Sequence, residues 1–451
     1  MPCSATLTQL AEVLAAKPIN LSNALATFTG ITTDTRNIKP GDVFVALRGG
    51  FFDGHEFVKE AITSGAIAAI VMCEFESTDL PLLQVKDTLQ AYQQIAQWWR
   101  KQFSIPIIGV TGSVGKTTTK ELIAAVLEPQ GKVLKTQANY NNEIGVPKTL
   151  LQLGSEHKFA VIEMAMRAKG EIALLTQIAC PTIGVITNVG TAHIGRLGSE
   201  DAIASAKCEL LAEMPKDSIA ILNADNQRLM TTSAQVWHGK TLTYGLEGGD
   251  LQGELLDNET ISVRDIQLPL PLAGTHNASN FLAALTVAEA LNIDWTLIAA
   301  NLIVNMPAGR SQRYELADDV VILDETYNAG LESMLAALQL LAQTTGKRRI
   351  AVLGAMKELG DRSLEFHTQV GAKVKQLNIE ALLILVDGAD ARAIATAAMP
   401  LAVECFVTPT DLLERLHKFV QKGDRLLFKA SHSVGLDRVV NQFRTEYNPS
   451  N

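Results

Sequence analysis

The segment Gly-Ser-Val-Gly-Lys-Thr at residues 112–117 has the composition and spacing of a phosphate-binding loop. An apolar run at 107–110 precedes it and a helical pattern at 120–127 follows it, which gives the strand, loop and helix that such a loop requires. Backbone N–H groups and the helix N-terminus would hold phosphate oxygens. We predict that Lys116 reaches the β- and γ-phosphates of a nucleotide and that the Thr117 hydroxyl ligates Mg²⁺.

The loop departs from the strict phosphate-loop pattern at one position, because Val110 stands where the pattern has glycine. The shorter Gly-x-x-Gly-Lys-Thr core is intact. A GTPase is expected to carry an Asn/Thr-Lys-x-Asp motif that reads the guanine base, and the sequence contains none. We therefore expect ATP to be the nucleotide.

Two further residues could complete a metal site beside this loop. Glu163 ends an apolar run at 159–162, and His193 lies in the loop that follows another apolar run at 183–187. The carboxyl ends of parallel strands meet at one edge of a sheet, where ligand sites gather. A carboxylate and a neutral imidazole are both suitable metal ligands. For each residue, the alternative is an ordinary solvated side chain.

The elements that must position these residues are short apolar runs that alternate with helical stretches along almost the whole chain. The strand-like runs are bounded by Gly, Asn or Asp and lie at 107–110, 160–162, 183–187, 219–222, 350–352 and 382–386. Continuous apolar runs of this length are typical of strands buried on both faces of a parallel sheet. We therefore predict the α/β class. A polar segment at 242–272 is predicted to be a small antiparallel insertion.

Two breaks divide the chain into three predicted domains. The first break, at 104–106, follows a helical stretch at 89–102, and the second is the run with Pro and Gly at 306–310. The predicted domains are an N-terminal α/β domain at 1–103, a central domain with a mostly parallel sheet and the phosphate-binding loop at 104–307, and a C-terminal Rossmann-like α/β domain at 308–451.

Composition and charge exclude several classes of protein. The chain has 451 residues, of which 47% are hydrophobic and 19% are charged, so each domain can bury a core and the disordered and fibrous classes are excluded. The net charge of -9 disfavours a protein that coats nucleic acid. The five cysteines are far apart, which excludes a disulfide scaffold and disfavours a zinc ribbon. No signal peptide is evident and no apolar run approaches the roughly 20 residues of a membrane span, so we expect a cytoplasmic protein.

Motifs along the whole chain resemble those of the Mur ligases, ATP-dependent enzymes that form amide bonds in peptidoglycan precursor synthesis. Besides the phosphate-binding loop, the motifs are Thr-Asp-Thr-Arg at 33–36, Asn-Tyr-Asn-Asn-Glu-Ile-Gly-Val-Pro at 139–147, Asn-Val-Gly-Thr-Ala-His at 188–193, Gly-Thr-His-Asn-Ala-Ser-Asn at 274–280 and Asp-Glu-Thr-Tyr-Asn-Ala at 324–329. The resemblance implies a UDP-binding N-terminal domain, a central ATPase domain and a C-terminal ligase domain.

The resemblance also implies an unusual role for Lys207. Judged from its helical stretch at 202–211 alone, Lys207 is an ordinary helix lysine, but it falls where the family has a carbamylated lysine. A carbamate would turn this cation into an anion that can face Mg²⁺, and its formation from CO₂ needs a neutral amine.

Other site residues follow from the resemblance in the same way. The catalytic residues implied are Lys116, Glu163, His193 and Lys207, and the metal ligands implied are Thr117, Glu163, His193 and carbamylated Lys207. The ATP-binding residues implied are Gly112, Ser113, Val114, Gly115, Lys116, Thr117, Thr118, Asn277, Asn280, Arg310 and Asp324, with the two asparagines at the adenine end. The substrate-binding residues implied are Thr33, Asp34, Thr35, Arg36, Asn141, Asn142, Tyr327 and Asn328.

Two C-terminal segments indicate a branch of the family. Residues 324–329 and the run Gly-Ala-Met-Lys-Glu-Leu-Gly at 354–360 resemble the branch that joins D-alanyl-D-alanine to UDP-N-acetylmuramoyl-tripeptide through an acyl phosphate. The Asp-Asn-Pro-Arg motif of the branch that adds a diamino acid is absent. Gly330-Leu331 replaces the usual Asn-Pro, and Lys-Ala-Ser-His at 429–432 replaces the usual Lys-Gly-Ser-Arg, which leaves the dipeptide contacts open.

Two alternatives to this branch remain open from the sequence. One is a ligase of the same family that adds a diamino acid, and the other is a nucleotide-driven switch that forms no amide bond. The partners implied by the resemblance are UDP-N-acetylmuramoyl-tripeptide and D-alanyl-D-alanine, with ATP and Mg²⁺, and either diaminopimelate or lysine as the third peptide residue. We expect a monomer without nucleic acid that serves cell wall biogenesis, cell shape and cell division.

Overall fold

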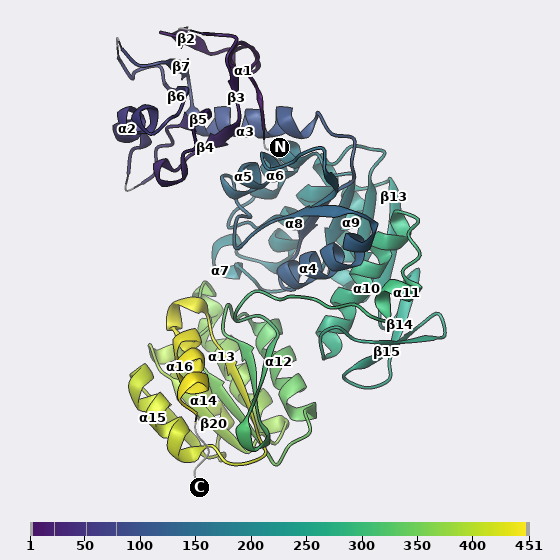
Figure 1. Ribbon diagram of the computed structural model, residues 1–451. Coiled ribbons are helices and arrows are strands. Elements are labelled where there is room, and N and C mark those ends of the chain that lie inside the picture. Colours follow the sequence, from purple (N-terminus) through teal and green to yellow (C-terminus); the bar gives the residue numbers. More distant parts are fainter. Residues whose placement is uncertain (1–2, 22, 51, 78, 448–451) are drawn as a thin grey trace.

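The computed structural model describes residues 3–21, 23–50, 52–77 and 79–447. Three α/β units follow one another along the chain, with the first unit above and the last unit below the central one in the view of Figure 1. Each unit is built on its own sheet, so the prediction of an α/β protein with three units is confirmed. The exact boundaries at 103 and 307 stay predictions, although both fall between strands of different sheets.

The first unit is built on a five-stranded sheet in the order β2-β7-β6-β5-β4. β4 to β7 run parallel, and β2 pairs antiparallel with β7 at one edge. The strands of the unit are β1 (Ala5–Thr6), β2 (Lys17–Ile19), β3 (Thr27–Phe28), β4 (Gly30–Thr32), β5 (Asp42–Val45), β6 (Ala68–Met72) and β7 (Leu82–Val85). Its helices are α1 (Leu7–Leu14), α2 (Val58–Thr63) and α3 (Thr88–Arg100).

Helix α3 joins the first unit to the central one. It begins after Asp87, whose carboxylate accepts the N–H of Gln90 at 2.8 Å and so caps the helix. At the other end, the buried Arg100 guanidinium donates to the backbone carbonyls of Ala179 at 2.8 Å and Cys180 at 2.9 Å in the central unit. These bonds satisfy a buried cation and fix the first unit against the second.

The central unit is built on a nine-stranded sheet in the order β16-β15-β14-β13-β12-β11-β8-β10-β9. Neighbouring strands from β9 to β14 run parallel, and β15 and β16 extend the sheet in antiparallel pairs, as predicted for the insertion. The strands are β8 (Ile107–Thr111), β9 (Lys132–Lys135), β10 (His157–Glu163), β11 (Ile183–Ile186), β12 (Ile219–Asn223), β13 (Lys240–Gly245), β14 (Leu251–Leu255), β15 (Thr260–Val263) and β16 (Ile266–Pro269).

Helices cover both faces of the central sheet because its strands bury side chains on both sides. Ile108 and Val110 of β8 point to one face, where α4 and α10 pack together, and Ile107 points to the other face, where α6 and α8 pack. The helices are α4 (Lys116–Leu127), α5 (Gly145–Leu150), α6 (Glu171–Ala179), α7 (Ile194–Leu197), α8 (Glu200–Glu213), α9 (Gln227–Val236), α10 (Thr275–Ala290) and α11 (Thr296–Ala299).

Helix α4 begins earlier than the sequence pattern predicted, at Lys116 rather than at residue 120. Gly115 has φ +82, and this left-handed turn leads the chain directly into the helix. The threonines at 117–119 are therefore helical despite their low helix propensity, because their side chains are buried against the sheet.

The last unit is built on a six-stranded sheet in the order β17-β18-β22-β19-β20-β21, parallel except for β17. The strands are β17 (Gln312–Leu316), β18 (Val320–Glu325), β19 (Arg348–Leu353), β20 (Ala381–Leu385), β21 (Val403–Phe406) and β22 (Asp424–Lys429). The helices are α12 (Leu331–Gln343), α13 (Ser363–Gln376), α14 (Ala389–Ala398), α15 (Pro409–Phe419) and α16 (Leu436–Glu446).

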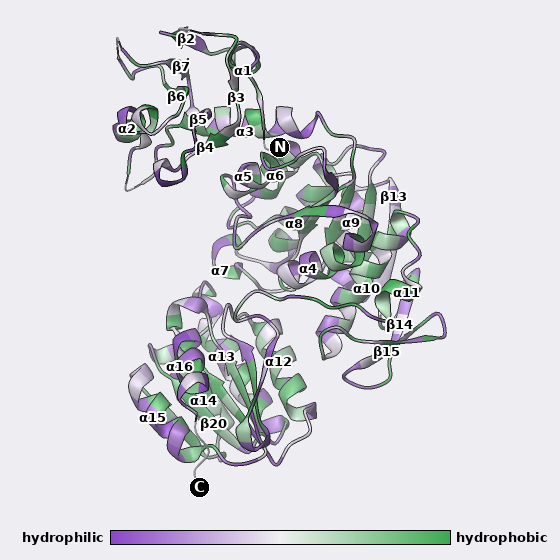
Figure 2. Cartoon of the chain, viewed as in Figure 1, coloured by the Kyte–Doolittle hydropathy of each residue, from purple (hydrophilic) through white to green (hydrophobic). Residues whose placement is uncertain are grey.

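Hydropathy follows this layering, since the strands are mostly hydrophobic and the helices alternate hydrophobic and hydrophilic positions (Figure 2). Within the described part of the chain, none of the helices combines the length and the apolar character needed to cross a membrane.

Candidate active site

The glycine loop, residues 112–116, lies at the carboxyl end of β8 and leads into α4. It is held by the support segment, which we define as residues 187–191 after β11. The Thr187 hydroxyl donates to the carbonyl of Val114 at 2.6 Å, and the Asn188 amide oxygen accepts the Val114 N–H at 3.0 Å. The Gly190 N–H donates to the Ser113 hydroxyl at 2.9 Å. The loop is therefore shaped by a neighbouring strand end before any ligand binds.

Glu163 lies beside this loop because β10 pairs in parallel with β8. Its buried carboxylate accepts the Thr117 hydroxyl at 2.9 Å and the Asn141 amide at 2.8 Å. The Glu163 N–H donates to the Thr136 hydroxyl at 3.0 Å, which ties β10 to the end of β9. Two of the predicted metal ligands, Thr117 and Glu163, are thus brought together, with Asn141 of the predicted substrate set against them.

Lys116 folds over its own loop. Its ammonium group donates to the carbonyls of Gly112 at 2.7 Å and Ser113 at 3.3 Å. Burial lowers the pKa of Lys116, the nearby Glu163 opposes that shift, and the nearby Arg310 adds to it. Arg310 lies at the start of the last unit, and its charge acts on Lys116, so the predicted ATP-binding arginine lies near the glycine loop.

Lys207 lies on α8 and is 1% exposed. Burial, together with the nearby Lys116, lowers the pKa of Lys207 well below its ordinary value. Among the described residues no hydrogen bond or ion pair holds its ammonium group. A buried lysine without a partner favours the neutral amine, which is the form that reacts with CO₂.

His193 follows the support segment and has a left-handed backbone with φ 65. Its Nδ1 lies 2.8 Å from a carboxylate oxygen of Glu358 in the last unit. Burial lowers the pKa of His193, and the nearby Lys116 and Lys207 add to the shift against the opposing effect of Glu358. His193 therefore shares the electrostatic environment of the two lysines while its ring is engaged by the last unit.

Of the four predicted metal ligands, Thr117 and Glu163 are in direct contact. The described ranges contain no group of three or more His, Cys, Asp or Glu side chains that could hold a metal ion. Thr117 and Glu163 do offer hard oxygen donors, which suits Mg²⁺, an ion that commonly takes one or two carboxylates and completes its shell with water and substrate phosphates. These residues thus fit Mg²⁺ bound together with a nucleotide.

The two asparagines predicted at the adenine end lie on α10. Asn280 accepts the Thr119 hydroxyl at 3.1 Å and packs against Gly115. Asn277 donates to the Ala273 carbonyl at 2.9 Å and lines a cavity of about 770 Å³ between the central and last units. Of the remaining predicted loop contacts, Thr118 is buried in the first turn of α4.

Three side chains from different parts of the last unit form a stack. The Arg310 guanidinium lies 3.9 Å from the centre of the Tyr327 ring, and the His432 ring stacks on Tyr327 at 5.7 Å between centres. The exposed Asn328 follows Tyr327. Asp324 is buried instead, where it accepts the N–H of Thr326 at 3.0 Å and its hydroxyl at 2.6 Å, and burial raises its pKa.

The N-terminal tetrad predicted for UDP lies apart from these groups. Asp34 accepts two bonds from the Arg36 guanidinium, both at 2.8 Å, and these bonds lower the pKa of Asp34 to about 2. Thr33 precedes this pair, Thr35 lies between its two residues, and both threonines are half-buried. In the described part of the chain, no hydrogen bond or ion pair joins the tetrad to the glycine loop. Asn142 also makes a local contact, since its amide oxygen accepts the N–H of Gly145 at 2.9 Å.

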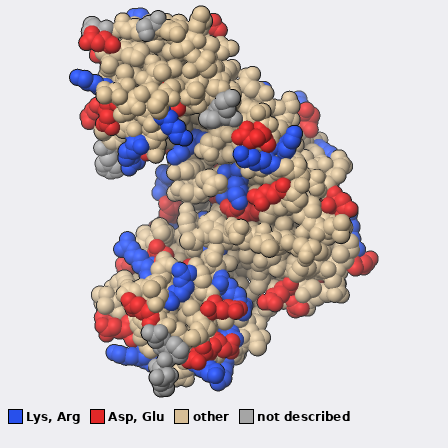
Figure 3. Space-filling model, in the orientation of Figure 1, with Lys and Arg blue, Asp and Glu red and all other residues tan. Residues whose placement is uncertain are grey.

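A hollow separates the first and last units, and Lys and Arg side chains lie on both of its rims (Figure 3). The tetrad belongs to the first unit and the Arg310–Tyr327–His432 stack to the last, while the glycine loop lies in the central unit. The predicted sites therefore lie on three separate units.

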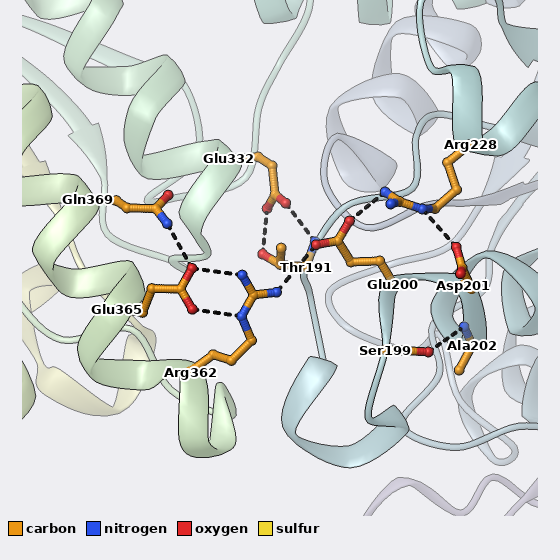
Figure 4. A network of polar contacts seen from close by, with 10 residues as sticks. All are labelled: Thr191, Ser199, Glu200, Asp201, Ala202, Arg228, Glu332, Arg362, Glu365 and Gln369. Carbon is orange, nitrogen blue, oxygen red and sulfur yellow. Dashed lines mark hydrogen bonds and ion pairs between the residues drawn. The ribbon is translucent and has the colours of Figure 1, made fainter.

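Sequence reasoning missed the contacts between the last and central units. Glu332 accepts the Thr191 N–H at 2.6 Å, Arg362 lies 3.4 Å from Glu200, and Glu358 contacts His193 (Figure 4 shows the first two). Glu332 is an acidic residue in the first turn of a helix, where the helix dipole favours it, so nothing in the pattern set it apart. Glu358 lay in a recognised motif without an assigned role.

Comparisons with known proteins agree with this arrangement. Three family profiles match the chain: "Mur ligase family, catalytic domain" at residues 27–100, "Mur ligase middle domain" at 110–288, and "Mur ligase, glutamate ligase domain" at 309–432. A UDP-N-acetylmuramoyl-tripeptide–D-alanyl-D-alanine ligase of Synechocystis is 58% identical over 433 residues, which cover 96% of this chain and 95% of the relative. The Escherichia coli protein of the same name is 37% identical, over 97% of this chain and 98% of the relative.

Solved structures give the same result. MurF from Acinetobacter baumannii has a TM-score of 0.89 at 29% identity, over 99% of this chain and 100% of that one. MurF ligase from Thermotoga maritima in complex with ADP has a TM-score of 0.84 at 31% identity, over 92% of this chain and 97% of that one. The family resemblance seen in the sequence is confirmed, and the chain belongs to the Mur ligase family.

Proposed function

We propose that this chain is an ATP-dependent ligase that joins D-alanyl-D-alanine to UDP-N-acetylmuramoyl-tripeptide in peptidoglycan precursor synthesis. Relatives of that name match nearly the whole chain at identities up to 58%. The observation that carries the proposal is a cluster of basic side chains, the buried Lys207 with the half-buried Lys116 and His193, near Glu163 and Arg310. Several basic groups against one carboxylate suit a site that receives anionic substrates.

The reaction requires activation of a carboxylate, which is a poor electrophile. Transfer of the γ-phosphoryl group of ATP to the terminal carboxylate of the tripeptide gives an acyl phosphate and ADP. The neutral amine of D-alanyl-D-alanine attacks the acyl carbon, phosphate leaves, and the amine loses a proton as the amide forms. Lys116 and the N–H groups of the glycine loop stabilise the charge on the phosphoryl oxygens, and the basic cluster reduces repulsion between the carboxylate and the γ-phosphate.

Thr117 and Glu163 are the residues proposed to hold Mg²⁺, and His193 and carbamylated Lys207 are proposed to hold metal on the side of the carboxylate. Bound Mg²⁺ supplies positive charge that offsets the negative charge of the phosphoryl oxygens. Support for the carbamate comes from the burial of Lys207, which favours the neutral amine. The contact with Glu358 uses Nδ1 of His193 and leaves Nε2 available to a metal.

Binding of the remaining groups is assigned by unit. The tetrad at 33–36, in the first unit, is proposed to meet the UDP moiety, and Tyr327 and Asn328, in the last unit, are proposed to meet the dipeptide. Asn277 and Asn280 are proposed to face the adenine end of ATP. We also propose that the protein is a monomer in the cytoplasm. Size-exclusion chromatography with light scattering would test the oligomeric state, and cell fractionation would test the location.

The decisive experiment is phosphate release from ATP with UDP-N-acetylmuramoyl-tripeptide, with and without D-alanyl-D-alanine, followed by mass analysis of the product. We expect release that needs both substrates and a product heavier by the dipeptide less one water. Release with a diamino acid and UDP-N-acetylmuramoyl-dipeptide would assign the chain to the diamino-acid branch. Nucleotide hydrolysis that ignores every peptide substrate would support a switch and overturn the ligase assignment.

A further inference from the structure

The last unit contacts the central one at the segment that supports the glycine loop. Glu332 of α12 accepts the Thr191 N–H at 2.6 Å through one carboxylate oxygen and the Thr191 hydroxyl at 3.2 Å through the other (Figure 4). The adjacent Gly190 N–H donates to Ser113 of the glycine loop at 2.9 Å. A carboxylate of the last unit is thus linked to the glycine loop by two hydrogen bonds through one short backbone segment.

We propose that Glu332 is a positioning residue that couples the last unit to the glycine loop through Thr191 and Gly190. The proposal deepens the proposed function, on which it rests, because it connects the segment assigned to the dipeptide with the loop assigned to ATP. A displacement of α12 moves the Glu332 carboxylate and, with it, the support segment. The Gly190 N–H that Ser113 accepts then changes position.

The contact between Glu332 and the support segment is tightly packed. A Cβ atom on Gly190 would overlap the Glu332 carboxylate, so the two segments approach as closely as glycine permits. Leu331 and Met334 bury the start of α12 in the core of the last unit, so the helix moves with its sheet. Only Gly330 separates this helix from the segment Tyr327-Asn328-Ala329.

A second contact between the same two units provides the control. Arg362 lies 3.4 Å from Glu200 at the start of α8, and it is also paired with Glu365 in its own unit at 2.8 Å (Figure 4). This contact holds the units together without touching the support segment. Removing it weakens the interface but leaves the Thr191 and Gly190 bonds in place.

The test compares Glu332→Ala, Glu332→Gln and Arg362→Gln in the full chain. We expect Glu332→Ala to weaken ADP binding, measured by calorimetry, and to raise the KM for ATP about tenfold, as the loss of a charge-assisted hydrogen bond implies. The KM for UDP-N-acetylmuramoyl-tripeptide should not change. Glu332→Gln should retain much of the affinity, because its amide oxygen still accepts the Thr191 N–H. Arg362→Gln should match the unmodified chain.

A double-mutant cycle with Ser113→Ala separates coupling from general loosening of the interface, because this substitution removes the acceptor of the Gly190 N–H at the far end of the connection. If Glu332 acts through the support segment, Glu332→Ala costs less in the Ser113→Ala background than in the original chain. Additive effects, or equal losses in Glu332→Ala and Arg362→Gln, would overturn the proposal. The calorimetric measurement does not need turnover. A chain that makes no ligated product would refute the ligase assignment, and a non-additive effect on ADP binding in that chain would still support the coupling.

Discussion

Gly115 of the glycine loop lies directly against Asn280 of α10, because a Cβ atom on Gly115 would stand 2.5 Å from the Asn280 amide oxygen. The same oxygen accepts the Thr119 hydroxyl at 3.1 Å. Gly115 also has φ +82, a conformation that other residues adopt only with strain. Space and backbone conformation therefore both require glycine where the loop enters α4.

We expect Gly115→Ala to lower nucleotide affinity tenfold or more, since backbone strain of about 1–2 kcal/mol adds to a clash with Asn280. Gly170→Ala is the matched control, because Gly170 also precedes a helix with φ +89 but nothing lies within 4 Å of its Cβ position. The control should lower stability slightly and leave ADP affinity unchanged. Equal losses of ADP affinity in calorimetry would show that general destabilisation, and not a change in the glycine loop, accounts for the effect.

The carbamate proposed at Lys207 predicts a specific signal. The chain supplied with ¹³C-bicarbonate should show a carbamate resonance that Lys207→Met abolishes, and kcat of this variant should fall about a hundredfold or more, as for loss of one stabilising charge in other active sites. Lys120→Met is the control, since Lys120 is also 1% exposed but is paired with Glu121 at 2.7 Å. A resonance that persists in Lys207→Met would refute the assignment.

Much of this arrangement was predictable from the sequence, because buried parallel strands and a glycine loop have local signatures. The run at 107–110 and the glycines at 112 and 115 predicted β8 and its loop, and the apolar run before Glu163 predicted β10. Parallel pairing of β8 with β10 then places Glu163 beside Thr117. Each of these inferences needs only the spacing of apolar residues, the positions of glycine and the rule that the carboxyl ends of parallel strands share one edge of the sheet.

Contacts between units were not predictable in the same way. Glu332 and Thr191 are 141 positions apart, and His193 and Glu358 are 165 apart, so no local pattern links them. Such pairs depend on how whole units are placed against one another. The sequence of the linker at 306–310 does not determine that placement. The burial of Lys207 was not predictable either, because it depends on the helices and strands that pack around α8 rather than on the pattern of that helix.

A histidine outside the site should make stability depend on pH. The ring Nδ1 of His157 accepts the N–H of Gly154 at 3.0 Å, so the folded state favours the neutral ring. Burial is the main cause that lowers the pKa of His157 below its ordinary 6.5, against the opposing charge of Glu156. The unfolded chain therefore binds more protons below pH 6.5, and the free energy of unfolding falls as pH drops from 6.5 to the lower folded pKa.

His157→Gln should flatten this part of the pH dependence, because glutamine offers an oxygen to the Gly154 N–H and does not titrate. Thermal midpoints of the two chains at pH 7.5, 6.5 and 5.5 would show the difference, with the unmodified chain losing more on acidification. The exposed His238 supplies the comparison: His238→Gln should leave the slope as it is. Parallel curves for the unmodified chain and His157→Gln would contradict the assignment.

The Arg310–Tyr327–His432 stack predicts that substitutions of Tyr327 and His432 change the KM for one substrate and not for the other. Tyr327 is held between a guanidinium at 3.9 Å and an imidazole at 5.7 Å, and cation–π and stacking contacts of this kind contribute about 1–2 kcal/mol. If Tyr327 contacts the dipeptide, His432→Ala should make the Tyr327 ring more mobile and raise the KM for D-alanyl-D-alanine several-fold. The KM for UDP-N-acetylmuramoyl-tripeptide should stay the same.

His432→Phe separates stacking from charge, because phenylalanine keeps a ring against Tyr327 but carries no proton. Near-normal KM for the dipeptide in this variant would assign the role to stacking, and a loss equal to that of His432→Ala would assign it to the imidazole nitrogens. Tyr327→Ala should raise the same KM about tenfold, as removal of both contacts implies. If none of the three substitutions changes the KM for the dipeptide, the dipeptide binds elsewhere on the last unit and the assignment of Tyr327 is wrong.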